Sequence, residues 1–177
     1  RTHLRAHRSP DWTIHAHNDI VVFMIPSLID PGFGAPWAVL PSGVHETTLE
    51  EVAARFATTP HRQWLFGGFQ RAVEALRLAG CRAVYLDGSF TTAKDHPGDF
   101  DGCWDHAGMD FSLLDPVLQN FAGKREAQKA KYLGEMFPAF APNGATGTFL
   151  DFFQIEKHSG QPKGILRLTL ATSKGAL

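Results

Sequence analysis

The spacing of apolar residues changes at Gly80, and this change limits the folds open to the chain. From Leu49 to Leu76 apolar residues recur every three or four positions, as they do on one face of an α-helix. Beyond Gly80, short apolar runs alternate with glycine, proline and aspartate, as in strands joined by turns. The order of two helices followed by mixed strands and helices predicts an α+β or an α/β fold.

Both N-terminal helices have recognisable ends. Thr47 or Thr48 can cap the first helix, because a glutamate, Glu50 or Glu51, follows three positions later in the capping-box pattern. We expect this helix to end near residues 58–60. The second helix is predicted over residues 61–79, and Gly80 is a common helix stop.

The remainder of the chain alternates between strand and helix signals. Short β-type runs predict strands over residues 82–86 and 99–104, and we expect a third strand within 132–140. The clearest alternation of apolar and polar residues predicts a strand over 164–170. A helix is predicted over 113–131 with an interruption near Gly123, and residues 148–156 suit either a strand or a short helix.

The first 40 residues differ from the rest of the chain. They contain four histidines, and three arginines lie among the first eight residues. We therefore divide the chain into an N-terminal arm, residues 1–40, and one domain, residues 41–177. We expect the arm to be a partly ordered extension or a strand packed on the domain.

The composition is that of an ordinary globular protein, with 44% hydrophobic and 20% charged residues. The net charge of −1 gives no bulk signal for nucleic-acid binding. No apolar run reaches the roughly 20 residues of a membrane helix, so we expect no membrane partner. Cys81 and Cys103 form no CxxC pair, which favours reduced thiols and a cytoplasmic protein.

Asp99 and Asp101 are the first candidates for chemistry. Residues two apart on a strand face the same way, so both carboxylates should point into one site. Unpaired, the two charges would repel each other and raise one pKa. A divalent cation removes that conflict. Mg²⁺ fits best, because proteins commonly hold it with one or two carboxylates plus substrate phosphates.

Gly88 and Ser89 follow the preceding predicted strand directly. A glycine there lets the backbone approach a ligand closely. A helix beginning at Ser89 would direct free N–H groups at an anion such as a phosphate, and the serine hydroxyl adds a donor. The two elements together predict a site for a metal and a nucleotide's phosphates.

The combined motif resembles that of a known superfamily. Leu86-Asp87-Gly88-Ser89, nine further residues and then Asp99-Phe100-Asp101 is similar to the signature of the polymerase-β-like nucleotidyltransferases. The blocks 40–45, 87–94 and 97–101, together with 153–154 and 163–165, resemble a family of small bacterial nucleotidyltransferase-domain proteins. The resemblance covers roughly residues 40–170. It implies an α+β fold, in which a nucleotidyltransferase-like mixed β-sheet with flanking helices is preceded by two N-terminal helices. It also implies a site for Mg²⁺ or Mn²⁺ and a nucleoside triphosphate, with Gly88 and Ser89 as nucleotide-binding residues.

The superfamily usually has a third carboxylate on a later strand, which binds the metal and helps to deprotonate the attacking hydroxyl. By resemblance Glu135 is the best match, and Asp151 is the competitor. The resemblance therefore implies Asp99, Asp101 and Glu135 as catalytic residues and metal ligands. A chain without a third carboxylate would bind nucleotide without catalysing transfer.

The small antitoxin-type members carry arginine four residues after the glycine, where this chain has Thr92. The nearest cation is Lys94, which is the expected phosphate contact.

The implied activity is transfer of a nucleoside monophosphate, with ATP as the expected donor, to a hydroxyl of a protein, an RNA or a small molecule. Related domains act in toxin–antitoxin or defence modules, so a toxin protein or tRNA is the expected partner. The alternative is a catalytically weak or inactive module that acts as an antitoxin-like partner of another protein.

Overall fold

The computed structural model describes residues 25–144 and 147–171. The predicted strands and helices lie within this part, whereas residues 1–24 of the predicted arm lie outside it. The elements in chain order are β1 (Gly43–Thr47), α1 (Leu49–Phe56), α2 (Pro60–Leu78), β2 (Ala83–Asp87), a 3₁₀ turn (Ser89–Thr91), β3 (Phe100–Trp104), two 3₁₀ turns (Pro116–Gln119 and Gly123–Arg125), α3 (Glu126–Tyr132), β4 (Gly134–Pro138), α4 (Phe149–Phe153) and β5 (Gly164–Thr169).

The five strands form one mixed sheet in the order β1-β5-β2-β3-β4. The outer pairs, β1 with β5 and β3 with β4, are parallel. The central strand β2 runs antiparallel to both of its neighbours. The α+β class and the mixed sheet are thereby confirmed. The sheet is not simply preceded by two helices, because β1 comes before α1 and joins the sheet through β5.

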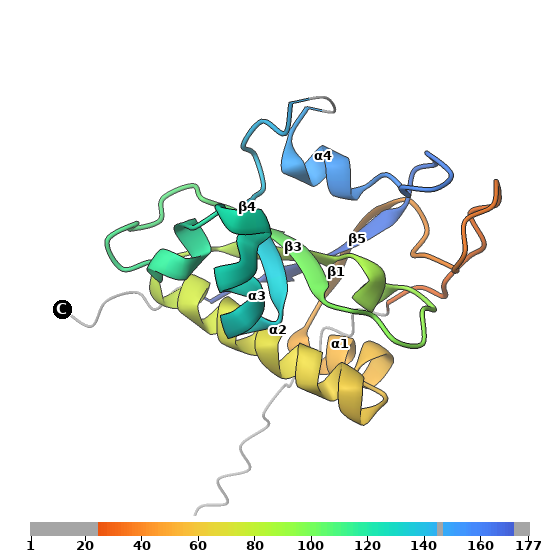
Figure 1. Ribbon diagram of the computed structural model, residues 1–177, viewed down its shortest axis with the longest axis horizontal. Helices are drawn as coiled ribbons and strands as arrows, with labels where there is room; N and C mark the ends of the chain where they lie inside the picture. Colours follow the sequence, from red (N-terminus) through yellow and green to blue (C-terminus); the bar gives the residue numbers. More distant parts are fainter. Residues whose placement is uncertain (1–24, 145–146, 172–177) are drawn as a thin grey trace, which may run out of the picture.

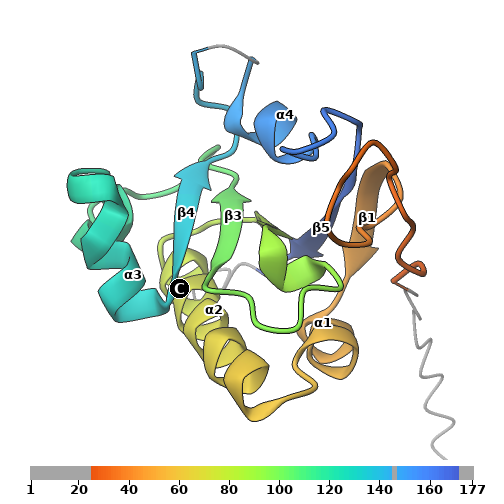
Figure 2. The same ribbon diagram turned by 45° about the vertical axis from the view of Figure 1, so that its right-hand side comes forward.

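Helices cover the two faces of the sheet unequally. Figures 1 and 2 show α1 and α2 along one side of the sheet and α4 on the other. The side chains facing α1 and α2 form the larger core, which includes Leu86, Phe100 and Trp104. The opposite face carries a smaller cluster around Tyr85 and Phe137, packed against Phe153 of α4. Strand alternation sends the odd-numbered side chains of β2, β3 and β4 to this second face.

Most of the predicted elements are confirmed, with small shifts at their ends. Thr48 caps α1, and both hydrogen bonds of a capping box link it to Glu51. Helix α2 begins at Pro60 and ends at Leu78. Of the two choices for residues 148–156, the short helix α4 is correct. The helix predicted over 113–131 is wrong in its first part, since only Glu126–Tyr132 is α-helical.

Residues 25–40 pack on the domain. Leu40 belongs to the larger core, and Ile29 forms a bridge with Val39. Cys81 and Cys103 are buried and free. No helix in the described residues has the length and apolar character needed to cross a membrane.

Candidate functional site

Three carboxylates form a row across β2, β3 and β4, near one end of these strands. Asp101 of β3 pairs with Asp87 of β2 on one side and with Glu135 of β4 on the other. Directly opposed residues on neighbouring strands point to the same face, here the face that carries α4. Asp99 lies two residues before Asp101 and adds a fourth carboxylate on this face. The sheet therefore brings together the three acidic residues predicted for the site.

Cations from two other segments neutralise most of this row. Lys163, just before β5, forms a buried ion pair with Asp87. Lys129 of α3 lies 3.1 Å from Asp99 and 2.5 Å from Glu135, measured from its Nζ atom to the carboxylate oxygens. Arg125 also pairs with Glu135. Within the described residues, Asp101 is the one carboxylate of the four that has no ion pair.

The surroundings of Asp101 favour its protonated form. Burial, together with the negative charges of Asp99, Asp87 and Glu135, raises the pKa of Asp101 to about 7. Burial also raises the pKa of Asp87, which the ammonium group of Lys163 opposes. A carboxylate held against like charges is a frequent mark of a functional site.

The Gly88 turn is built around Asp101. Gly88 has φ +79° and ψ −166°, a conformation that is essentially restricted to glycine. A β-carbon there would lie 2.2 Å from Oδ2 of Asp101. Ser89 begins a single 3₁₀ turn, Ser89–Thr91, in place of the α-helix that we considered from the sequence. A single turn has little helix dipole, so only its few backbone N–H groups remain as possible phosphate contacts.

A cavity of about 330 Å³ opens beside this turn. This volume is within the range of small-molecule sites, roughly 300–1,000 Å³. The predicted residues Gly88, Ser89, Lys94, Asp99 and Asp101 all line it. Glu135 is not among the described residues that line the cavity, and its carboxylate pairs with Arg125 and Lys129.

The donor set fits a divalent cation that is held jointly with a ligand. Within residues 25–144 and 147–171, no three His, Cys, Asp or Glu side chains form a ready-made metal site. Mg²⁺ rarely needs such a site, since it usually takes one or two carboxylates and completes its shell with water and phosphate oxygens. Asp99 and Asp101 offer this minimal set, and a cation would relieve the repulsion at Asp101.

Lys94 lies in the loop after the 3₁₀ turn and lines the cavity. Its Nζ atom lies 4.9 Å from the ring centre of Trp37, a cation–π contact. The neighbouring Thr92 donates from its hydroxyl to the carbonyl of Ser89, at 2.8 Å, and so closes the turn. Lys94 thus lines the same cavity as Asp99 and Asp101, and its ammonium group also contacts the Trp37 ring.

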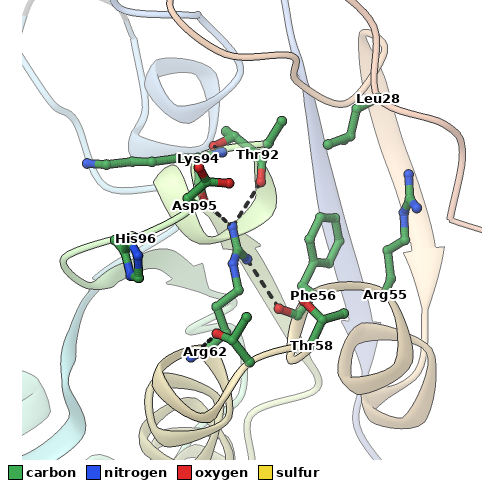
Figure 3. A pocket seen from close by; sticks show the side chains of 11 residues that line it. Leu28, Arg55, Phe56, Thr58, Arg62, Thr92, Lys94, Asp95 and His96 are labelled. Carbon is green, nitrogen blue, oxygen red and sulfur yellow. Dashed lines mark hydrogen bonds between the residues drawn. The ribbon is translucent and has the colours of Figure 1, made fainter.

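A larger cavity, about 450 Å³, lies against the same loop and shares Thr92 and Lys94 with the first. Figure 3 shows Arg62 within it, with its guanidinium bonded to backbone carbonyls. Arg62 is buried and donates to the carbonyls of Phe56, Phe90, Thr92 and Lys94. This arginine therefore holds the loop in place and is not free for a ligand. The carboxylate row is absent from this cavity's described lining, so the smaller cavity is the better functional candidate.

Several residues of the site were not predicted. Asp87 is the last residue of β2. The antiparallel register of β2 and β3 sets it opposite Asp101, so the two side chains lie on the same face of the sheet. Arg125, the left-handed residue that caps α3, and Lys129 of α3 both pair with Glu135. Asp151, the competitor for third carboxylate, is exposed on α4 and completes a capping box with Thr148.

Comparison with known proteins gives a family and no activity. Residues 31–169 match the model of DUF6932, a family of unknown function. No curated protein and no solved structure matches the chain.

Proposed function

The chain belongs to the DUF6932 family, and from the geometry of its site we propose that it is a metal-dependent nucleotidyltransferase of the polymerase-β-like type. The observation that carries this proposal is the carboxylate row of Asp87, Asp101 and Glu135, with Asp99, beside the Gly88 turn. Of this arrangement, Asp87, Gly88, Asp99 and Asp101 line a cavity of small-molecule size, about 330 Å³. A nucleoside triphosphate, with ATP as the expected one, is the substrate.

Each side chain has a separate task in this proposal. Asp99 and Asp101 hold Mg²⁺ or Mn²⁺, which when bound would neutralise charge on the α-phosphate. The Gly88–Ser89 turn lines the cavity and contacts a phosphate there. The Ser89 hydroxyl and the Lys94 ammonium contact the phosphates that leave. The cavity aligns the acceptor with the donor, which lowers the entropic part of the barrier.

The transfer balances without a further reactant. The oxygen of the acceptor hydroxyl bonds to the α-phosphorus, the bond from that phosphorus to the bridging oxygen breaks, and pyrophosphate leaves. Glu135 accepts the hydroxyl proton, which requires it to separate from Lys129 and Arg125 and to turn toward the cavity that it does not line in this structure. The acceptor is a hydroxyl of a protein, such as a partner toxin, of tRNA or of a small molecule.

The same ion pairs favour a second candidate function. Glu135 contacts two cations, and Thr92 stands where antitoxin-type relatives of the superfamily carry arginine. A site with its third carboxylate neutralised would bind nucleotide or a partner protein without catalysing transfer. In that case the protein is an antitoxin-like binding module.

The two functions are separated by labelling. The purified protein is incubated with Mg²⁺, α-³²P-labelled nucleoside triphosphates and an extract of acceptors. The enzyme labels an acceptor, and the Asp99→Asn/Asp101→Asn double variant does not. Asp151→Asn is the matched control, because this carboxylate is exposed on α4 and outside the row. It should label like the wild type.

Thermal melting completes the test. A nucleoside triphosphate at 100 times its dissociation constant stabilises the folded state by about 2.7 kcal/mol. A Mg²⁺-dependent shift without labelling supports the binding module. Equal labelling by the wild type and the double variant, or no melting shift with any nucleoside triphosphate, refutes the proposed enzyme.

A further inference from the structure

The cavity beside the carboxylates also has an apolar wall. Trp37 and Val39 contribute to it from the segment before β1. Phe152, Phe153 and Ile155 contribute from α4 and the residues that follow it. One cavity is therefore lined both by groups suited to a metal and phosphates and by aromatic and aliphatic side chains.

Two of these apolar side chains are exposed to solvent. Phe152 is 47% exposed and Ile155 is 41% exposed. Exposed apolar surface forfeits about 25 cal/mol for each Å² that burial would remove from water. A ligand with a flat apolar part would recover some of that free energy here.

Trp37 is held in a defined place on this wall. The Lys94 ammonium lies 4.9 Å from its ring centre, and the His158 ring approaches it edge-on with the ring centres 6.4 Å apart. Lys94 thus contacts the aromatic wall and lies on the loop that follows the Gly88 turn. A single ligand that reaches both regions must have an anionic part and an aromatic part.

We propose that Trp37 and Phe152 form the binding site for the nucleobase of the donor nucleotide. The proposal rests on the proposed function, since it takes the phosphates of the same ligand to lie at Gly88, Ser89 and the aspartates. Stacking on aromatic side chains tolerates any base, because every base has a π-face. The cavity of about 330 Å³ suits one nucleotide better than a macromolecular segment.

The test separates the base from the phosphates. Binding of Mg²⁺·ATP and of Mg²⁺·tripolyphosphate is measured by calorimetry for the wild type and for Trp37→Leu and Phe152→Leu. Base stacking is worth about 1–3 kcal/mol, so each variant should weaken ATP binding by about 5- to 150-fold. Tripolyphosphate binding should stay unchanged in both variants. Trp37→Phe should restore most of the ATP affinity, because it keeps an aromatic ring.

Trp64→Leu is the matched control, because Trp64 is 56% exposed on α2 and lines neither cavity. It should leave ATP binding unchanged, and melting curves report whether each variant is folded. Equal affinity of the wild type for ATP and tripolyphosphate overturns the base site and leaves the proposed function standing. Failure of both ligands to bind overturns both proposals. Loss of tripolyphosphate binding in folded Trp37→Leu also overturns the base site, since the indole would then support the phosphate end.

Discussion

Gly88 and Asp101 approach so closely that a β-carbon on the glycine would lie 2.2 Å from Oδ2 of the aspartate. Because Gly88 has no side chain, it leaves the space that the Asp101 carboxylate occupies. The two halves of the motif are one structural unit, because the antiparallel β2–β3 pairing sets Asp87 opposite Asp101 and the turn at Gly88 follows at once. This contact explains the glycine without any ligand.

Gly88→Ala should destabilise the fold through two separate effects. Alanine is strained at φ +79°, and its methyl group would displace the Asp101 carboxylate. We expect a loss of about 2–4 kcal/mol in the free energy of unfolding, measured by urea denaturation. Gly34→Ala is the matched control, because Gly34 has φ +76° with nothing within 4 Å of its added β-carbon. Equal losses in the two variants would show that the approach to Asp101 contributes nothing.

The raised pKa of Asp101 predicts a pH-dependent stability. The pKa is about 7 in the folded state, against 3.8 for an unperturbed aspartate, so the folded state retains a proton that the unfolded state loses. The protein therefore loses stability as pH rises from about 4 to about 7, and the loss is complete above that range. Asp101→Asn lacks this titration. Between pH 5 and pH 8 the wild type should lose roughly 2–3 kcal/mol relative to Asp101→Asn. Parallel stability curves for the two proteins would contradict the shifted pKa.

The local elements could be predicted from the sequence because their signals are local. The capping box at Thr48, the helix stop at Gly80 and the apolar alternation near Ile165 need only their neighbours. β1 gave no such signal, since Gly43–Thr47 is a largely polar edge strand that pairs with a strand about 120 residues later, such as Thr47 with Leu168. The helix predicted before Glu126 fails because Asp115 and Pro116 start a 3₁₀ turn.

Some residues of the candidate site could likewise be predicted from the sequence, and others could not. Asp99 and Asp101 share a face through strand alternation, which the sequence reveals directly. The neighbour relation between Asp101 and Glu135 depends on the parallel register of β3 and β4, set by the long connection through α3. Trp37 and Phe152 reach the cavity from segments far apart in the chain. Tertiary packing alone brings these residues together, so no local pattern predicts them.

Arg62→Met should loosen the loop that carries Lys94. The buried guanidinium donates to four backbone carbonyls, and methionine would leave these acceptors unpaired. Unpaired buried acceptors cost about 1–3 kcal/mol each, so we expect a loss of about 3 kcal/mol or more. Urea denaturation measures the loss, and limited proteolysis within residues 90–96 reports the loop. Arg55→Met is the control, because Arg55 lines the same cavity but is exposed. A loss in Arg62→Met no greater than in Arg55→Met would contradict this role.

Lys129→Met should increase the affinity of the protein for divalent cations. The ammonium group joins Asp99 and Glu135, so a cation that uses Asp99 must compete with it. Lys129 is 42% exposed at its side chain, and a pair of this kind is worth up to about 1 kcal/mol. Removing it should strengthen Mn²⁺ binding roughly five-fold, as measured by the free Mn²⁺ signal in electron paramagnetic resonance. Lys131→Met is the matched control, since Lys131 is 51% exposed and pairs with Asp115 outside the row. Equal Mn²⁺ affinities in the two variants would show that Lys129 does not compete for the metal. A gain in Lys129→Met alone would show that the Lys129 ammonium and the metal compete for the same carboxylates.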